Sequence, residues 1–204
     1  MSPQRKELEK HLKEMCQGMG FKKMKYKYQK QINDNFCANI MFPCASYQIK
    51  YHILVGCSVG ITSIQIQSIF EQCSELVNDK EHGNTILTNL GYITPQNHYM
   101  EWDYSEQSDP NVIFGEIQEK IERYAYPFFD RYSNMDNITD AIMSGIFHAP
   151  IDRDILLSII YYLHNDKAMA SKHLDRLVKK RQDYRGFNNI LEVTFEKNLR
   201  KLLQ

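Results

Sequence analysis

Apolar residues at the start of the chain recur every three or four positions, which is the spacing of one face of an α-helix. The members of this stripe are Leu8, Leu12, Met15 and Met19. Ser2 and Pro3 precede the stripe and suit the first turn of a helix, while glycines at 18 and 20 suit its end. The pattern predicts an N-terminal helix that packs one face against a core.

From residue 23 apolar and polar positions alternate, which is the period of a half-buried β-strand. One face of this segment holds Lys23, Lys25 and Lys27, and the other holds Met24, Tyr26 and Tyr28. A polar run at 33–35 then predicts a turn. Further alternating segments lie at 36–42, 47–57, 85–93 and 99–105. Together these segments predict a mostly antiparallel sheet of about five strands.

Helical spacing returns at 64–77, although the boundary near residue 63 fits a strand as well. The clearest helix of the chain covers 110–132, where apolar residues recur at steps of three and four after Asp109 and Pro110. Pro127 lies inside this helix and lacks a backbone N–H group, so it predicts a kink or a break there.

Residues 134–204 contain only short helical patterns, with no alternating segment among them. The chain is therefore predicted to be an α+β protein, in which the N-terminal helix and the helix at 110–132 pack against the sheet. We expect an α+β domain over 1–133 and a helical subdomain over 134–204 that packs on it.

Four segments carry a resemblance to a known family. They are the helix ending in Gly-Phe-Lys-Lys at 20–23, the tyrosine-rich strand after it, the strand at 36–42, and the Tyr-Ala-Tyr-Pro-Phe-Phe-Asp helix end at 124–130. Over about residues 5–165 the chain resembles a bacterial domain-of-unknown-function family of small cytoplasmic α+β proteins. It departs from the family's pattern in having a single tryptophan, Trp102. The resemblance implies no shared reaction, cofactor or catalytic residue, and a loose association with bacterial conflict and immunity systems.

Composition supports a folded globular chain. Of the 204 residues, 43% are hydrophobic and 25% are charged, which excludes a collagen-like or wholly disordered protein. The stretch at 51–70 lacks charged residues but carries several polar side chains, so no membrane span is expected. The first residues lack the apolar run of a signal peptide, and we expect a cytoplasmic protein. The 5 cysteines show no C-x-x-C spacing, which predicts buried, reduced thiols.

Charge is balanced overall but uneven along the chain. Residues 1–60 carry a net charge of +6, residues 61–150 carry −10, and residues 151–204 carry +4. Such polarity either steers a charged partner or pairs neighbouring elements within the fold.

The lysines at 23, 25 and 27 are the first candidate interaction site, because cations beside aromatic rings can hold phosphates and stack bases. Strand alternation instead places the aromatic residues in the core and Lys23, Lys25 and Lys27 on a solvated face. Nucleic-acid binding through this strand is therefore kept only as an alternative, and the neutral overall charge counts against it.

Glu101 and Asp103 are two apart on a predicted strand and share a face, which is the minimum arrangement for paired acid and base carboxylates. Trp102 points to the opposite face and is expected in the core. No histidine or cysteine spacing matches a metal site, and no phosphate-binding or nucleophile motif occurs. We therefore expect no catalytic, cofactor or metal site.

Basic residues crowd the end of one helical segment in the tail, where they complement the helix dipole. Arg176 and Lys180 in this segment, with Tyr161 and Tyr162 in the preceding one, are candidates for a protein-binding groove, since Arg and Tyr are enriched at binding hot spots.

These observations favour a non-enzymatic protein-interaction module whose partner is another protein, such as a toxin or effector bound by an immunity-type protein. The first alternative is a small-ligand-binding protein or enzyme with a pocket between the sheet and the helix at 110–132. The second alternative is nucleic-acid binding through the lysine-rich strand.

Overall fold

The computed structural model describes residues 2–46, 52–74, 83–183 and 190–204. The chain divides into two compact units, each built from two separate stretches. The first unit comprises Met1–Ile61 and Leu87–Ser133, and the second comprises Thr62–Ile86 and Asn134–Gln204. This division differs from the expected one, because the stretch at 62–86 groups with the C-terminal helices rather than with the α+β domain.

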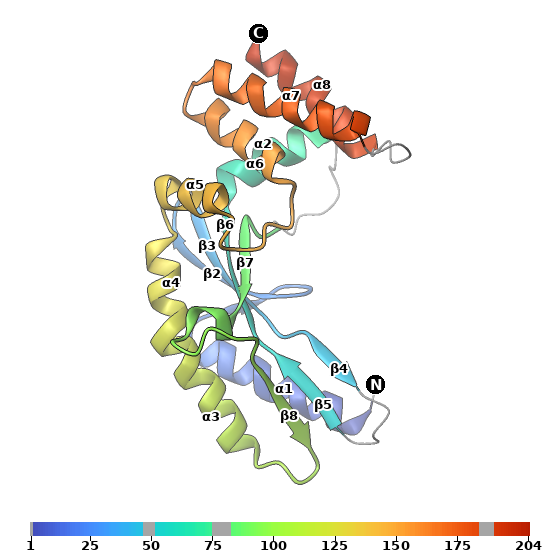
Figure 1. The fold of residues 1–204 in the computed structure, drawn as a ribbon. Helices are drawn as coiled ribbons and strands as arrows, with labels where there is room; N and C mark the ends of the chain where they lie inside the picture. The colour runs from blue at the N-terminus through green and yellow to red at the C-terminus, as the bar shows by residue number, and fades with distance from the viewer. Residues whose placement is uncertain (1, 47–51, 75–82, 184–189) are drawn as a thin grey trace. The chain divides into compact units, whose positions relative to one another are not determined.

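Within the described residues, strands form a five-stranded sheet in the order β1-β2-β3-β6-β7 and a three-stranded sheet in the order β4-β5-β8 (Figure 1). The strands are β1 (Lys22–Lys23), β2 (Tyr28–Asn33), β3 (Phe36–Met41), β4 (Cys44–Ser46), β5 (His52–Gly56), β6 (Ser58–Ser63), β7 (Ile86–Asn89) and β8 (Glu101–Ser105). The β1-β2-β3 ladder and the β4-β5-β8 ladder are antiparallel. The α+β class predicted from the sequence is confirmed, with a second, smaller sheet that the alternation did not indicate.

The first predicted strand is interrupted in its middle. The Met24 N–H donates to the Lys27 carbonyl at 2.7 Å, which turns the chain between β1 and β2. Inside this turn the expected alternation fails, because Tyr26 is 70% exposed and the Lys27 side chain is only 5% exposed. The prediction of Tyr26 in the core and of Lys27 on a solvated face is therefore wrong.

The second predicted strand pair is shorter than expected. β7 ends at Asn89, whose side-chain oxygen accepts hydrogen bonds from the Gly91 N–H at 2.9 Å and the Met100 N–H at 3.0 Å. The chain continues as a single 3₁₀ turn, η1 (Leu90–Ile93), instead of a strand. Of the strand predicted at 47–57, β5 is the described part, and residues 47–51 lie outside the described residues.

Two helical segments pack against the smaller sheet in the first unit. They are α1 (Pro3–Gly18) and α3 (Pro110–Lys120). The His11 ring of α1 stacks on Phe114 of α3 with centroids 5.1 Å apart, and Phe114 meets the Tyr104 ring of β8 at 5.8 Å. The Ser2 side chain accepts a hydrogen bond from the Arg5 N–H, so α1 begins where the sequence indicates.

The helix expected over 110–132 consists of three segments. After α3 comes a π-helical turn, η2 (Ile121–Ala125), and then α4 (Tyr126–Arg131). The Tyr126 N–H donates to the Ile121 carbonyl five residues earlier. Pro127 has no N–H to donate and disturbs the regular α-helical ladder. The predicted disturbance at Pro127 thus takes the form of a wider turn immediately before it.

The second unit is helical. Its helices are α2 (Ile64–Ser74), α5 (Met135–Ser144), α6 (Arg153–Leu163), α7 (Lys167–Asp183) and α8 (Ile190–Leu203). α6 lies in its centre and is buried along most of its length. The Phe70 ring of α2 packs against Phe195 of α8 with centroids 5.9 Å apart, although 125 residues separate them.

All 5 cysteines lie in the described part of the chain and are free thiols, with Cys44 half-buried and the others buried. Burial raises the pKa of the Cys16 thiol to about 12 and that of Cys73 to about 11. None of the helices in the described residues has the length and apolar character that a membrane crossing requires.

Candidate functional site

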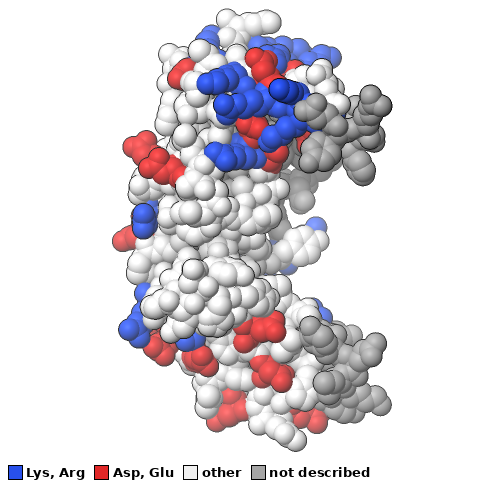
Figure 2. Space-filling view, in the orientation of Figure 1, with Lys and Arg blue, Asp and Glu red and all other residues white. Residues whose placement is uncertain are grey.

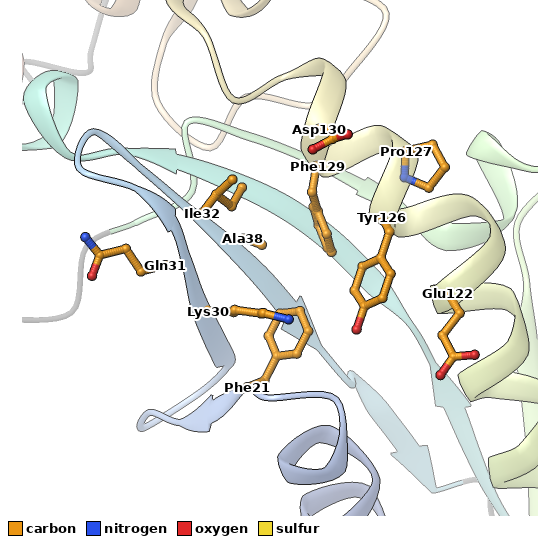
Figure 3. Close-up of a pocket in the computed structure, with 10 residues that line it drawn as sticks. All are labelled: Phe21, Lys30, Gln31, Ile32, Ala38, Glu122, Tyr126, Pro127, Phe129 and Asp130. Atoms are coloured by element: carbon orange, nitrogen blue, oxygen red, sulfur yellow. The ribbon is translucent and has the colours of Figure 1, made fainter.

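A cavity of about 550 Å³ lies in the first unit, between the β2-β3 hairpin and the η2–α4 segment (Figure 3). We call it the α4 pocket. Its lining residues are Phe21, Lys30, Gln31, Ile32, Ala38, Glu122, Tyr126, Pro127, Phe129 and Asp130. It lies between the larger sheet and the helical region at 110–132, which is where the pocket of a small-ligand-binding protein or enzyme is expected from the sequence.

The inner wall of the α4 pocket is apolar. Phe21, Ala38 and Phe129 are all buried, and the Phe21 and Phe129 ring centroids are 6.2 Å apart. Ala38 of β3 is the register partner of Lys30 on β2. Because alanine has a small side chain, this position leaves room beside the Lys30 stem. The rings of Tyr126 and Phe129 point from the helical side toward the sheet (Figure 3).

Lys30 brings a cation to this apolar wall. Its Nζ donates a hydrogen bond to the Met19 carbonyl at 3.1 Å and lies 5.4 Å from the Tyr126 ring centroid and 5.7 Å from that of Phe21. The Met19 carbonyl follows the C-terminus of α1, where the helix dipole favours a positive charge. Lys30 therefore stabilises the end of α1 and also faces the cavity.

Tyr126 places a hydroxyl near the same point, since its Oη donates to the Met19 carbonyl at 3.5 Å. Burial raises the pKa of Tyr126, and the charge of Glu122 adds to that effect. The hydroxyl is thus a hydrogen-bond donor at neutral pH. Glu122 accepts a hydrogen bond from the Gln118 amide at 2.8 Å, and Asp130 lies beyond Phe129, away from Lys30 (Figure 3).

The lysines expected to form one interaction face are not brought together. Lys23 lies over the Tyr28 ring at 4.3 Å from its centroid, and Lys25 lies over the Tyr26 ring at 4.7 Å. Lys27 lies in the turn between β1 and β2 and is buried, so it does not share an exposed face with Lys23 or Lys25. None of the three lines the α4 pocket.

Glu101 and Asp103 lie on one exposed face of β8, while Trp102 is buried on the other, as the alternation predicts. Asp103 is bonded to the Nδ1 of His52 on β5, with distances of 2.8 and 3.0 Å to its two oxygens. Both side chains are about half exposed, so the pair sits on the open surface of the smaller sheet. The sequence did not indicate this pair because its members are 51 positions apart.

In the second unit, Tyr161 of α6 stacks on His173 of α7 with centroids 5.4 Å apart and an interplanar angle of 8°. Tyr162 is half-buried and Arg176 is exposed. Lys180 is exposed at the helix surface and pairs with Asp152 at 3.4 Å and with Asp154 at 2.5 Å. The structure thus places Tyr161 and Lys180 around one polar cluster and leaves Tyr162 and Arg176 outside it.

This Asp154 cluster consists of Asp154, His173 and Lys180. His173 Nδ1 lies 2.8 Å from Asp154 Oδ1, and both side chains are less than a tenth exposed. Burial alone would raise the pKa of Asp154, but the hydrogen bonds and charges of His173 and Lys180 outweigh it and lower that pKa. Burial opposes the charge of Lys180 as well, yet the two aspartates raise the pKa of its ammonium group. The sequence did not indicate the cluster.

Basic side chains also gather on one face of the second unit (Figure 2). On α7, the exposed cations that make no ion pair among the described residues are Lys167, Lys172, Arg176 and Lys179. Because nothing in the described chain neutralises them, they form an open cationic stripe, which we call the α7 stripe.

The described residues hold no group of three or more His, Cys, Asp or Glu side chains that could bind a metal ion. Comparisons with protein-family models, curated proteins and solved structures find no match for this chain. The resemblance to a bacterial family of α+β proteins therefore stays a prediction.

Proposed function

We propose that this chain is a small-ligand-binding protein and that the α4 pocket is its binding site. The observation that carries the proposal is a cavity of about 550 Å³ with a buried apolar wall, into which one ammonium group and one hydroxyl converge. Ligand sites in proteins have volumes of roughly 300–1,000 Å³ and combine an apolar lining with a few placed polar groups.

The local backbone supports this proposal. The π-helical turn η2 lies directly beside the pocket and carries Glu122, and π-helical turns inside α-helices are often found at functional sites. The opposite wall is a paired hairpin, so strand and helix hold the lining side chains in place.

The buried part of the pocket is suited to binding, and the lining groups that could transfer a proton, Lys30, Glu122 and Asp130, lie at exposed positions. The hydroxyl of the pocket belongs to Tyr126, whose raised pKa makes it a donor and not a base at neutral pH. The buried members of the wall are Phe21, Ala38 and Phe129, and none of them can transfer a proton or attack a substrate.

The test is a fragment screen by protein-observed NMR, repeated on two variants of the full chain. Ile32→Trp places a large side chain in the pocket, whereas Val112→Trp makes the same addition at an exposed α3 position outside it. We expect fragments that bind the wild type and Val112→Trp but not Ile32→Trp. The proposal fails if no fragment binds the wild type, or if Ile32→Trp folds and binds the same fragments.

A second candidate function is the binding of an acidic protein through the α7 stripe, as expected for an interaction module. Its support is the set of four exposed cations without an ion-pair partner in the described chain. An immunity-type role against a toxin or effector, in the cytoplasm, remains a prediction from the family resemblance.

The second candidate is tested by affinity capture with the wild type, with the double variant Arg176→Glu and Lys179→Glu, and with Lys13→Glu as a control on exposed α1. It requires a stoichiometric acidic partner that high salt releases and that the double variant loses. A partner retained equally by all three baits would contradict it.

A further inference from the structure

We infer that the ligand of the α4 pocket is a monocarboxylate with an apolar body, held through its carboxylate by Lys30 and Tyr126. This inference rests on the proposed function and specifies the chemistry of its ligand.

The Lys30 ammonium group has three N–H donors, of which the Met19 carbonyl takes one. Among the described residues no carboxylate lies within 4.0 Å of its nitrogen. The Phe21 and Tyr126 rings lie within cation–π distance, but a ring face is a weaker partner than an anion. The charge facing the cavity therefore lacks its preferred partner.

Tyr126 adds a second donor at the same place. Its Oη is 3.5 Å from the Met19 carbonyl, which is at the long limit for a hydrogen bond. A carboxylate oxygen beside that carbonyl would accept from both the Lys30 Nζ and the Tyr126 hydroxyl. Hydrogen bonds to a charged acceptor are shorter and about twice as strong as neutral ones.

The rest of the lining limits the charge of the ligand. Glu122 and Asp130 are on the helical side of the pocket, so the lining as a whole carries one cation and two carboxylates. Because repulsion from these two groups grows with the charge of the ligand, a dianion such as a phosphate monoester would be repelled more strongly than a monocarboxylate. A carboxylate directed at Lys30 faces away from Asp130, and Glu122 is the acidic group that remains near it (Figure 3).

The apolar body of the ligand follows from the wall. Phe21 and Phe129 are buried, and Ile32 and Pro127 add apolar side chains to the lining. An aryl or branched alkyl group placed there would exchange water contact for contact with aromatic rings.

The experiment compares phenylpropionate with phenylpropanamide, which has the same body without the charge, and with phenyl phosphate. Dissociation constants are measured by NMR titration for the wild type, for Lys30→Met and for Lys22→Met, an exposed lysine on β1 outside the pocket. We expect the wild type to bind phenylpropionate about ten-fold more tightly than the amide, which is about 1.4 kcal/mol. Phenyl phosphate should bind more weakly than phenylpropionate.

Lys30→Met should remove the preference for the carboxylate and retain binding of the amide, whereas Lys22→Met should keep the preference. If Lys30→Met does not fold, the same question is answered by titrating the wild type at low and high salt. Added salt should weaken the binding of phenylpropionate and leave the binding of phenylpropanamide unchanged. Equal affinity for amide and carboxylate overturns the inference. If Ile32→Trp then blocks both probes, the pocket remains a binding site and only its ligand class is wrong.

Discussion

Asp154→Asn gives the sharpest test of the forces that hold the second unit together. Asp154 is less than a tenth exposed, and its two carboxylate oxygens are bonded to His173 at 2.8 Å and to Lys180 at 2.5 Å. The substitution keeps the shape of the side chain but removes its negative charge, so it weakens the bond to His173 and leaves Lys180 beside an amide.

The expected loss follows from the burial of each partner. A hydrogen bond to a charged group contributes about 1.5–3 kcal/mol, of which the asparagine oxygen retains about 1 kcal/mol as a neutral bond. Removing one member of a buried pair costs about 3–5 kcal/mol. Lys180 is about half exposed, so its share is screened by solvent and is taken as less than about 1 kcal/mol. Subtracting the roughly 1 kcal/mol that the neutral bond retains from the cost of about 3–5 kcal/mol for breaking a buried pair, we expect Asp154→Asn to lower the free energy of unfolding by about 2–4 kcal/mol.

The assay is urea unfolding followed by far-ultraviolet circular dichroism, with Asp140→Asn on the exposed face of α5 as the matched control. The control should change stability by less than about 0.5 kcal/mol. Because the pKa of Asp154 is lowered below its ordinary 3.8, its contribution is present above that pH and is lost as pH falls through the lower folded value. The difference between wild type and Asp154→Asn should therefore hold at neutral pH and shrink only in strong acid. An Asp154→Asn loss no larger than that of the control would refute the reasoning.

Three further predictions concern the backbone, the thiols and the alkaline limit. Gly91→Ala should destabilise the first unit by about 3 kcal/mol or more, because a Cβ there would lie 2.1 Å from the backbone oxygen of residue 98. Gly115 lies in open space within α3, so Gly115→Ala should stabilise the unit by about 0.5–1 kcal/mol. Thermal unfolding of both variants measures these changes. In the folded protein a thiol reagent should label the half-buried Cys44 first and the four buried thiols only on unfolding, as mass spectrometry of the labelled peptides would show. Lys180→Met should lower the free energy of unfolding by less than about 1 kcal/mol at neutral pH. Because the pKa of Lys180 is raised above its ordinary 10.5, its contribution to stability should vanish as the pH rises through the higher folded value. Urea titrations at increasing pH measure this loss.

Periodicity predicted those features of the fold that depend on neighbouring residues. The α+β class, the turn between β2 and β3, the start of α1 at Ser2 and the disturbance at Pro127 all follow from local spacing or from one residue's chemistry. Alternation failed between Lys23 and Tyr28, because a tight backbone turn resets which face a side chain takes. The hydrogen bond that closes this turn, from the Met24 N–H to the Lys27 carbonyl, leaves no mark in the hydrophobic pattern.

The contacts that define the sites were beyond the sequence for a different reason. His173 and Asp154 meet across two helices, and His52 and Asp103 meet across two strands, so neither pair has a spacing that local structure would predict. The α4 pocket draws its wall from the loop after α1, from β2 and β3 and from the η2–α4 segment. The lysine at position 30 stands out in the sequence only as one more member of a basic run.

The helices α2 and α8 pack together but lie far apart in the sequence, which has a consequence for synthesis of the chain. α2 leaves the ribosome 125 residues before the Phe195 that covers its Phe70, and at 5–20 residues per second this delay is on the order of ten seconds. During that time the apolar face of α2 has no native partner from α8, and the nascent chain carries a surface that a chaperone would recognise.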